Sequence, residues 1–320
     1  MMPAWNVRRH GRGSRLVGRA LAVVVLAGCA DADRLGPSGE RTALLPPASA
    51  VASASAGVMF ASYGLTPSQI TAVHTGVIRS PTPSSLLDYL AQVRAKGGRV
   101  LIKLSGSENL YRNGDGTFSL AKWQSAVDKY RGVNFSSYIA DGTIVGHYII
   151  DEPHFASRWG GQVIPQSTVE AAAKYSKQLW PTLPTIVNAP AHWLAASTIT
   201  YTSLDAGWAM FRAGTSSSPT TWAAAQVTKA KKKGLGLFAG LNVLDGGDGS
   251  SGFHGNYPKK WAMSANELRT YGSALLSQSY VCGFAMWKYS ATYYDRADVK
   301  SAMTDLSAQA RTHARTSCRQ

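Results

Sequence analysis

The sequence predicts a single (β/α)8 barrel, and three observations lead to this fold class. Eight short apolar runs of strand length lie between residues 58 and 287. Most of them are separated by segments with helical periodicity, two of which end at glycine. The domain expected over residues 57–316 has the length that one such barrel needs, about 250 residues.

The expected strands alternate with helices along the chain. Capping boxes formed by Ser167 with Glu170 and by Ser264 with Glu267 are predicted to begin two of the helices. The weakest point is the first crossover, where residues 66–70 leave room for only a short helix. The strands are expected at 58–63, 72–78, 99–104, 143–151, 185–188, 206–211, 235–242 and 281–287, and the helices at 84–96, 120–130, 167–179, 221–233, around 264–275 and at 297–311.

A doubly wound open sheet is the structural alternative, because it also alternates strands and helices. No glycine-rich phosphate loop follows any of the expected strands, so the barrel is favoured.

The composition is that of a folded globular protein, with 45% hydrophobic and 16% charged residues. The formal net charge is +15, but the only dense basic run, residues 229–233, lies where a helix should end and where lysines suit the helix dipole. Nucleic acid is therefore not expected as a partner, and we expect a monomer.

The N-terminus has the pattern of an export signal. Five arginines without an acidic residue precede the apolar run 20–28, which is too short for a confident membrane span. The sequence Leu26-Ala-Gly-Cys29 resembles a bacterial lipobox, which implies that residues 1–28 are a lipoprotein signal peptide and that Cys29 carries the lipid. An ordinary signal peptide is the alternative. Residues 29–56, rich in Ala, Ser and Pro, are expected to be a flexible tether, so the resemblance implies an exported, membrane-anchored lipoprotein of the bacterial cell envelope.

Two further cysteines, Cys282 and Cys318, follow Cys29. Export would permit a disulfide between them, but the sequence leaves open whether they meet.

Polar and aromatic residues cluster where the expected strands end. In a barrel such positions form the active site, and carboxylates, amides and flat rings together suit a sugar substrate. Lys103 is expected to form an ion pair with Glu108 or Asp151. The strand-end candidates are Tyr63, Arg79, Lys103, Glu108, Asp151, Glu152, Asn188, Arg212, Asn242, Asp245, Trp287 and Tyr289.

The run Asp151-Glu152-Pro153 ends the fourth expected strand. It resembles the Asn-Glu-Pro motif of the clan A glycoside hydrolases, a superfamily of TIM barrels. The resemblance implies that Glu152 is the general acid/base and that Asp151 takes the place of the sugar-binding Asn. Trp287 is similar to the aromatic floor under the reactive sugar in that superfamily. Further substrate-binding residues are expected to be Asn188, Tyr289, Tyr63, Arg212 and Asn242.

The sequence departs from this superfamily at the seventh strand, where a second glutamate is expected and none is present. Asp245, in the glycine-rich loop after that strand, and Glu108, after the third strand, are the candidates for the second carboxylate. A retaining mechanism needs the two carboxyl groups ~5–5.5 Å apart and an inverting one ~6.5–9.5 Å. A non-catalytic glycan-binding barrel is therefore the alternative function.

His147 and His154 lie near the two carboxylates of strand four and raise a metal site as a further alternative. They are seven residues apart with a proline between them, so neither a metal nor another cofactor is expected.

Overall fold

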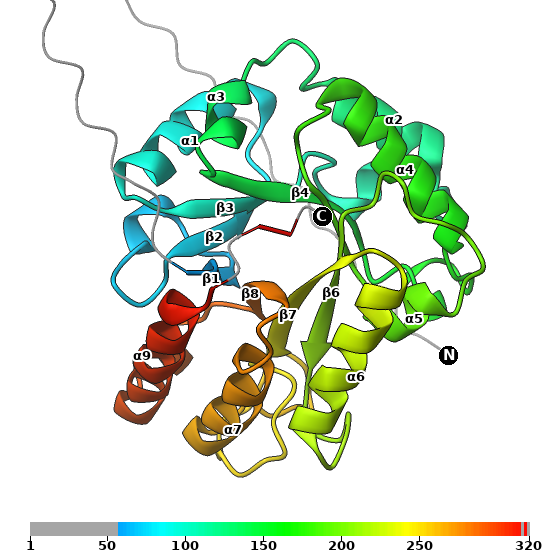
Figure 1. The fold of residues 1–320 in the computed structure, drawn as a ribbon. Coiled ribbons are helices and arrows are strands. Elements are labelled where there is room, and N and C mark those ends of the chain that lie inside the picture. Colours follow the sequence, from blue (N-terminus) through cyan, green and yellow to red (C-terminus); the bar gives the residue numbers. More distant parts are fainter. Residues whose placement is uncertain (1–56, 315–316, 319–320) are drawn as a thin grey trace, which may run out of the picture. The chain divides into compact units, whose positions relative to one another are not determined.

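The computed structural model describes residues 57–314 and 317–318 of the 320-residue chain. The predicted signal peptide, the lipidation site Cys29 and the tether lie outside the described residues. Within them, eight parallel strands close into a barrel in sequence order, with helices around it (Figure 1). The predicted (β/α)8 fold class is confirmed.

The strands match the predicted apolar runs closely, and the barrel closes where Phe60 of β1 pairs with Phe284 of β8. The main difference is at β2, which begins at Gly76 because residues 71–75 form a turn in which Thr71 N donates to the carbonyl oxygen of His74. The strands are β1 (Phe60–Tyr63), β2 (Gly76–Arg79), β3 (Arg99–Ile102), β4 (Ile144–Asp151), β5 (Thr185–Asn188), β6 (Ala206–Phe211), β7 (Gly236–Asn242) and β8 (Val281–Trp287).

The long helices also follow the prediction, and the first crossover contains only one 3-10 turn, Pro67–Gln69. The short helices α3 and α8 were not predicted. The helices are α1 (Leu86–Ala95), α2 (Leu120–Asp128), α3 (Ser136–Ala140), α4 (Gln166–Leu179), α5 (Ala191–Ala195), α6 (Pro219–Lys232), α7 (Ala265–Leu276), α8 (Ala291–Tyr294) and α9 (Ala297–Thr312).

One of the two predicted capping boxes is confirmed. Ser264 Oγ accepts a hydrogen bond from Glu267 N, and the Glu267 carboxylate accepts one from Ser264 N. The box at Ser167 is wrong, because α4 already begins at Gln166. The Glu170 carboxylate instead accepts three backbone N–H groups from residues 202–204, which ties α4 to the loop before β6.

The barrel interior is filled by large side chains that meet small ones. A Cβ atom at Gly240 would lie 2.6 Å from Trp208 Nε1, so the absence of a side chain there makes room for the indole. The same interior cluster contains Met59, Ile78, Leu101, Tyr148, Ile186, Trp208, Phe238 and Ala285. No helix among the described residues is both long and apolar enough to cross a membrane.

A disulfide joins Cys282, near the start of β8, to Cys318 near the C-terminus, which answers the question that the sequence leaves open. Cys318 is buried in the interior cluster, and its carbonyl oxygen would lie 2.7 Å from a Cβ atom at Gly236, the first residue of β7. The C-terminal segment therefore packs against the barrel where β7 and β8 begin (Figure 1).

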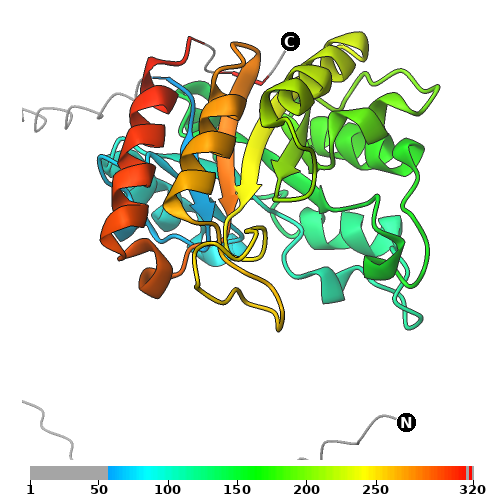
Figure 2. The same ribbon diagram turned by 90° about the horizontal axis from the view of Figure 1, so that it is seen from below.

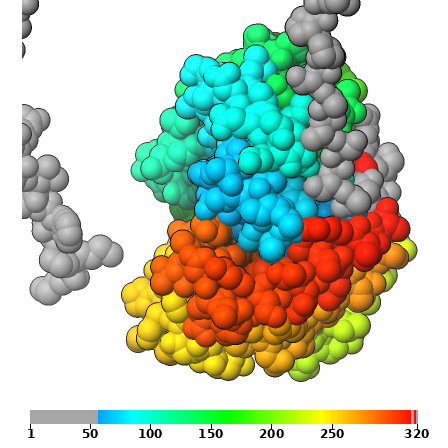
Figure 3. Space-filling view, turned by 90° about the vertical axis from the view of Figure 1, so that its left-hand side faces the viewer, coloured from blue at the N-terminus to red at the C-terminus, as the bar shows by residue number. Residues whose placement is uncertain are grey.

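The two ends of the barrel domain lie together. Val58 N donates to the carbonyl oxygen of Ala310 in α9, and Ser307 Oγ donates to that of Val73. Figure 3 shows α9 (red) beside the first segments of the domain (blue and cyan). The opposite ends of β7 and β8 face the side from which the long loop before α7 extends (Figure 2).

Candidate active site

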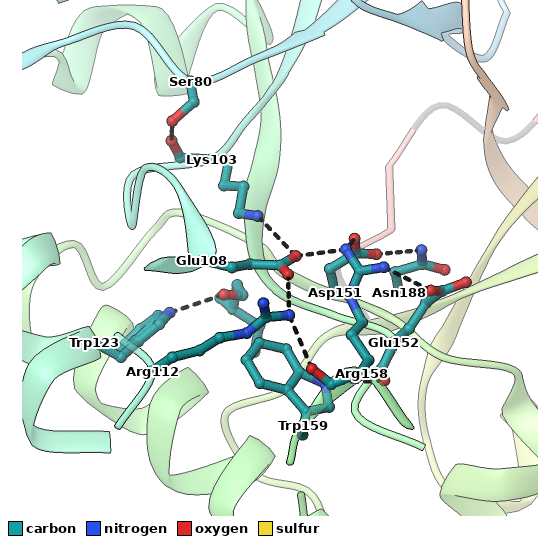
Figure 4. A network of polar contacts seen from close by, with 11 residues as sticks. Ser80, Lys103, Glu108, Arg112, Trp123, Asp151, Glu152, Arg158, Trp159 and Asn188 are labelled. Atoms are coloured by element: carbon teal, nitrogen blue, oxygen red, sulfur yellow. Dashed lines mark hydrogen bonds and ion pairs between the residues drawn. The ribbon is translucent and has the colours of Figure 1, made fainter. Parts of the chain in front are cut away.

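Strand β4 ends in two carboxylates that point toward one cation. Consecutive strand residues normally point to opposite faces of a sheet, which would separate Asp151 from Glu152. Glu152, however, has a φ of 46°, in the left-handed region, and its N–H donates to the carbonyl oxygen of Asn188 on β5. This turn of the backbone redirects the Glu152 side chain, and both carboxylates reach the guanidinium of Arg158 (Figure 4).

Arg158 binds three carboxylates, which come from the end of β4, the residue after it and the loop after β3. Its Nη1 donates to Glu152 Oε2 at 3.0 Å, and its Nη2 donates to Glu108 Oε1 at 2.6 Å and to Asp151 Oδ2. Burial lowers the pKa of Arg158, but Asp151 and Glu108 raise it more, so the net shift is upward. Arg158 is therefore a permanent cation at the centre of this network.

Asp151 is the ionised member of the adjacent pair. Its Oδ1 accepts a hydrogen bond of 2.7 Å from Asn188 Nδ2, and Tyr148 also donates to its carboxylate. Burial raises the pKa of Asp151, but Arg158, Lys103 and these hydrogen bonds bring it below its ordinary value. Every polar contact of Asp151 thus stabilises a carboxylate that stays charged.

Glu152 behaves in the opposite way. Its burial and the negative charge of Asp151 raise its pKa to about 7, although Arg158 opposes the shift. Two neighbouring carboxyl groups whose surroundings separate their pKa values are the usual arrangement of an acid beside an anion. Glu152 can therefore hold and release a proton near neutral pH.

Glu108, one candidate for the second carboxylate, is surrounded by cations. Besides Arg158, its Oε2 accepts from Arg112 Nη2 at 2.9 Å, and Lys103 Nζ lies 3.7 Å from Oε1. The predicted ion pair of Lys103 with Glu108 is confirmed. Arg112 also donates to the carbonyl oxygen of Arg158 at 2.8 Å, so the network links the loops after β3 and β4 (Figure 4).

Asp245, the other candidate, holds the long loop after β7 in place. Its Oδ1 accepts from the backbone N–H groups of Asn256 and Tyr257 at 2.7 and 3.2 Å, and its Oδ2 accepts from Asn256 Nδ2 at 3.0 Å. Asp245 is buried but lines the same cavity as Glu152. Its carboxylate oxygens are thus already used by the loop.

Two cavities open at the carboxyl ends of the strands, and Asp151, Arg158 and Trp287 line both of them. The first, about 660 Å³, lies over the loops after β1, β2 and β3 and includes Tyr63 and Glu108. The second, about 420 Å³, contains most of the other predicted residues. The predicted residues in it are Glu152, Asn188, Arg212, Asn242 and Asp245. Its lining also includes Trp208, Met210, His154, His192 and Lys260.

Trp287 lies at the junction of the two cavities, at the end of β8. Its ring centroid is 4.6 Å from that of Tyr63, and its peptide bond to Lys288 is cis. Tyr289 is separated from the other predicted binding residues, because its ring packs against Tyr294 and lines neither cavity. The rings of Tyr63 and Trp287, inclined by 36° to each other, form an aromatic surface that borders the first cavity.

The two histidines of the metal alternative have different surroundings. His147 is fully buried, where its Nδ1 pairs with Ser176 Oγ at 2.8 Å and its ring stacks on Trp123. His154 lines the second cavity and packs against Phe155. In the described part of the chain, no group of three or more His, Cys, Asp or Glu side chains is placed to hold a metal ion.

Three residues of the site, Arg158, Tyr148 and Trp208, are not among those predicted from the sequence. Arg158 lies in the 3-10 turn Ala156–Arg158, outside any strand end. The only signal in the sequence is a lone arginine a few residues after two carboxylates. The apolar runs that contain Tyr148 and Trp208 predict core residues, and both side chains do pack in the interior cluster.

The chain is similar to known proteins in structure only. No family model and no curated protein sequence matches the chain. Among solved structures, a β-glucuronidase from an uncultured Clostridium sp. is 12% identical, with a TM-score of 0.50 over 80% of this chain and 50% of that one. Saccharomyces cerevisiae Gas2 in complex with a compound is 14% identical, with a TM-score of 0.48 over 82% of this chain and 65% of that one.

A putative α-L-fucosidase from Bacteroides thetaiotaomicron is 12% identical, with a TM-score of 0.49 over 84% of this chain and all of that one. The chain thus spans between half and two thirds of the length of the β-glucuronidase and Gas2 chains. At this level of identity, the likeness to the β-glucuronidase shows the barrel fold alone.

Proposed function

We propose that the protein is a glycoside hydrolase that cleaves a glycosidic bond in a poly- or oligosaccharide, with Glu152 as the general acid/base. The observation that carries the proposal is the pair at the end of β4. Glu152 has a pKa of about 7 and lines a cavity, while the adjacent Asp151 stays ionised. A carboxylic acid that remains protonated near neutral pH is what protonation of a glycosidic oxygen requires.

The surrounding residues have matching roles in this proposal. Glu152 protonates the departing oxygen and later removes a proton from water. Asp151 raises the pKa of Glu152 by its charge, and Arg158 keeps the two side chains in register. Tyr63 and Trp287 form the stacking surface. The polar groups of Asn188, Asn242 and Arg212 in the second cavity bind sugar hydroxyls.

The same proposal places the enzyme outside the cytoplasm, as a lipoprotein of the bacterial cell envelope with its anchor at Cys29. The disulfide between Cys282 and Cys318 supports export, because disulfides persist mainly in oxidising compartments. The substrate would then be a glycan accessible at the cell surface.

A glycan-binding barrel without activity is the second candidate function. The observation that favours it is that the oxygens of Glu108 and Asp245 are already bonded to protein groups. Such a protein would keep the cavities and the stacking surface but would have no group to attack the sugar.

The experiment incubates the purified chain with a panel of polysaccharides and oligosaccharides and measures new reducing ends. We expect hydrolysis by the wild type, and a loss of at least ~100-fold in Glu152→Gln, the usual contribution of a general acid. Sugar binding, measured by calorimetry, should persist in the variant. Asp305→Asn, which removes an exposed carboxylate of α9, is the control.

Full turnover by Glu152→Gln would contradict the role of this residue. Binding of a glycan by the wild type, without any hydrolysis across the panel, would favour the second candidate function.

A further inference from the structure

The mechanism needs a nucleophile or a base besides Glu152. The contacts of Glu108 and Asp245 indicate that neither carboxylate supplies it. Glu108 and Glu152 bind the two Nη atoms of one guanidinium, so their carboxylates are at most about 8 Å apart. This distance would suit an inverting pair. The guanidinium of Arg158, however, lies between them and takes the position of an attacking water.

Asp245 is also poorly placed for attack. A nucleophile needs an oxygen that can approach the anomeric carbon, but both oxygens of Asp245 accept hydrogen bonds from residues 256 and 257. Moving this carboxylate would release the loop that it holds.

Asp151 precedes Glu152 in the chain and is more deeply buried. Its two oxygens accept from Asn188 and Arg158, and Tyr148 also donates to it. A charged carboxylate held in this way, next to the acid, is suited to stabilise positive charge on a bound substrate.

The second cavity has the chemistry to receive an acetamido group. Trp208, Met210 and Trp287 offer apolar walls, and Asp151 and Asn188 offer polar atoms beside Glu152. Arg212 and Asn242, which line the same cavity, offer hydrogen-bond donors. An acetamido group presents a methyl group, an N–H donor and a carbonyl acceptor, which together match this lining.

We propose that the substrate is a glycan containing 2-acetamido-2-deoxy sugars, whose own acetamido oxygen is the nucleophile. This inference rests on the proposed glycosidase function. Substrate assistance of this kind is an established alternative to two protein carboxylates. It accounts for a single carboxyl group with a raised pKa in a site where the other carboxylates are fully bonded.

In the first step, Glu152 gives its proton to the glycosidic oxygen and the bond from that oxygen to C1 breaks. The acetamido carbonyl oxygen forms a bond to C1, which yields a cyclic oxazolinium ion, and the leaving sugar departs as an alcohol. The negative charge of Asp151, beside Glu152, stabilises the positive charge of this ring. In the second step, water adds to C1 as Glu152 takes its proton, and the ring opens to the free sugar with retained configuration.

The test compares two aryl glycosides that differ only at C2, with a 2-acetamido group in one and a 2-hydroxyl group in the other, in the gluco and galacto series. We expect kcat/KM to be at least ~100-fold higher for an acetamido substrate. A sugar-fused thiazoline, which mimics the cyclic intermediate, should inhibit competitively and bind far more tightly than the product sugar.

Azide provides a second measurement, because it replaces a missing carboxylate nucleophile and leaves a glycosyl azide. We expect no glycosyl azide from Asp245→Ala or Glu108→Ala. Its formation by either variant, or a covalent glycosyl-enzyme trapped with a 2-fluoro sugar, would overturn the acetamido nucleophile and leave the glycosidase proposal standing.

Equal rates on the 2-hydroxyl and 2-acetamido substrates would also overturn the acetamido nucleophile and leave the glycosidase proposal standing. No hydrolysis of any glycan or glycoside would contradict the glycosidase function itself, and with it the inference that rests on it.

Discussion

The two ends of the barrel are built from different chemistry. At the carboxyl end, Arg158 joins Asp151, Glu152 and Glu108 in a network beside two cavities. At the amino end of β7 and β8, Cys318 is buried among apolar side chains and is bonded to Cys282. The first arrangement brings like charges together, and the second reduces the freedom of the unfolded chain. The contrast suits a division in which the proposed chemistry takes place at the carboxyl end and the disulfide at the other end contributes stability.

Arg158 should be where the carboxyl end is most sensitive, because three carboxylates depend on it. Replacing it in Arg158→Gln leaves these charges without their partner, and we expect a loss of about 3–5 kcal/mol in unfolding free energy at pH 8. Denaturant unfolding measures this loss, and activity assays on the folded fraction show whether the substitution also affects catalysis.

The pH dependence of this loss is a sharper check. Without the guanidinium, which lowers the pKa values of both Asp151 and Glu152, these two values should lie above those of the unfolded chain, so the negative charges destabilise the folded state as pH increases. The variant should therefore lose less stability at pH 5 than at pH 8. An equal loss at both pH values would contradict the charge network as its cause.

The disulfide should affect only stability. We expect Cys282→Ser combined with Cys318→Ser to lower the free energy of unfolding by about 4 kcal/mol, since the bond closes a loop with a sequence separation of 36. The kcat of the folded protein should not change. Wild type in reducing agent is the matched control. A fall in kcat at unchanged stability would contradict the claim that the disulfide affects only stability.

The third prediction concerns the alkaline limb of activity. Glu152 must be protonated in the free enzyme, and its pKa is about 7. The logarithm of kcat/KM should therefore be level below pH 7 and fall by about one unit per pH unit above it. In Asp151→Asn, which removes the negative charge that raises this pKa, the midpoint should move to lower pH. An unchanged midpoint in Asp151→Asn would contradict the effect of the Asp151 charge on the pKa of Glu152.

Much of the fold follows from local pattern. Buried parallel strands are short apolar runs, so their number and order, and hence the closed barrel, could be predicted from the sequence. The start of β2 could not, because residues 72–75 are apolar enough for a strand but form a turn. The false capping box at Ser167 shows the same limit, since Glu170 finds partners distant in sequence.

The candidate site was less predictable than the fold. Strand ends locate Asp151, Glu152, Asn188 and Trp287 in one region, as expected for a barrel. Arg158, which organises the carboxylates, comes from a turn whose path no local pattern fixes. The left-handed backbone at Glu152 is likewise invisible in the sequence, because glutamate rarely adopts it.

The most direct test of Glu152 as the proton donor is the dependence of kcat/KM on the leaving group. A series of aryl glycosides with leaving-group pKa from about 4 to 10 is hydrolysed by wild type and by Glu152→Gln, with Asp305→Asn as control. A good leaving group needs no proton, whereas a poor one depends on the acid.

We therefore predict a shallow dependence in the wild type and a steep one in Glu152→Gln, with the two enzymes nearly equal for the most acidic leaving group. Parallel dependences, with the variant slower by the same factor for every substrate, would contradict the assignment of Glu152 as the acid.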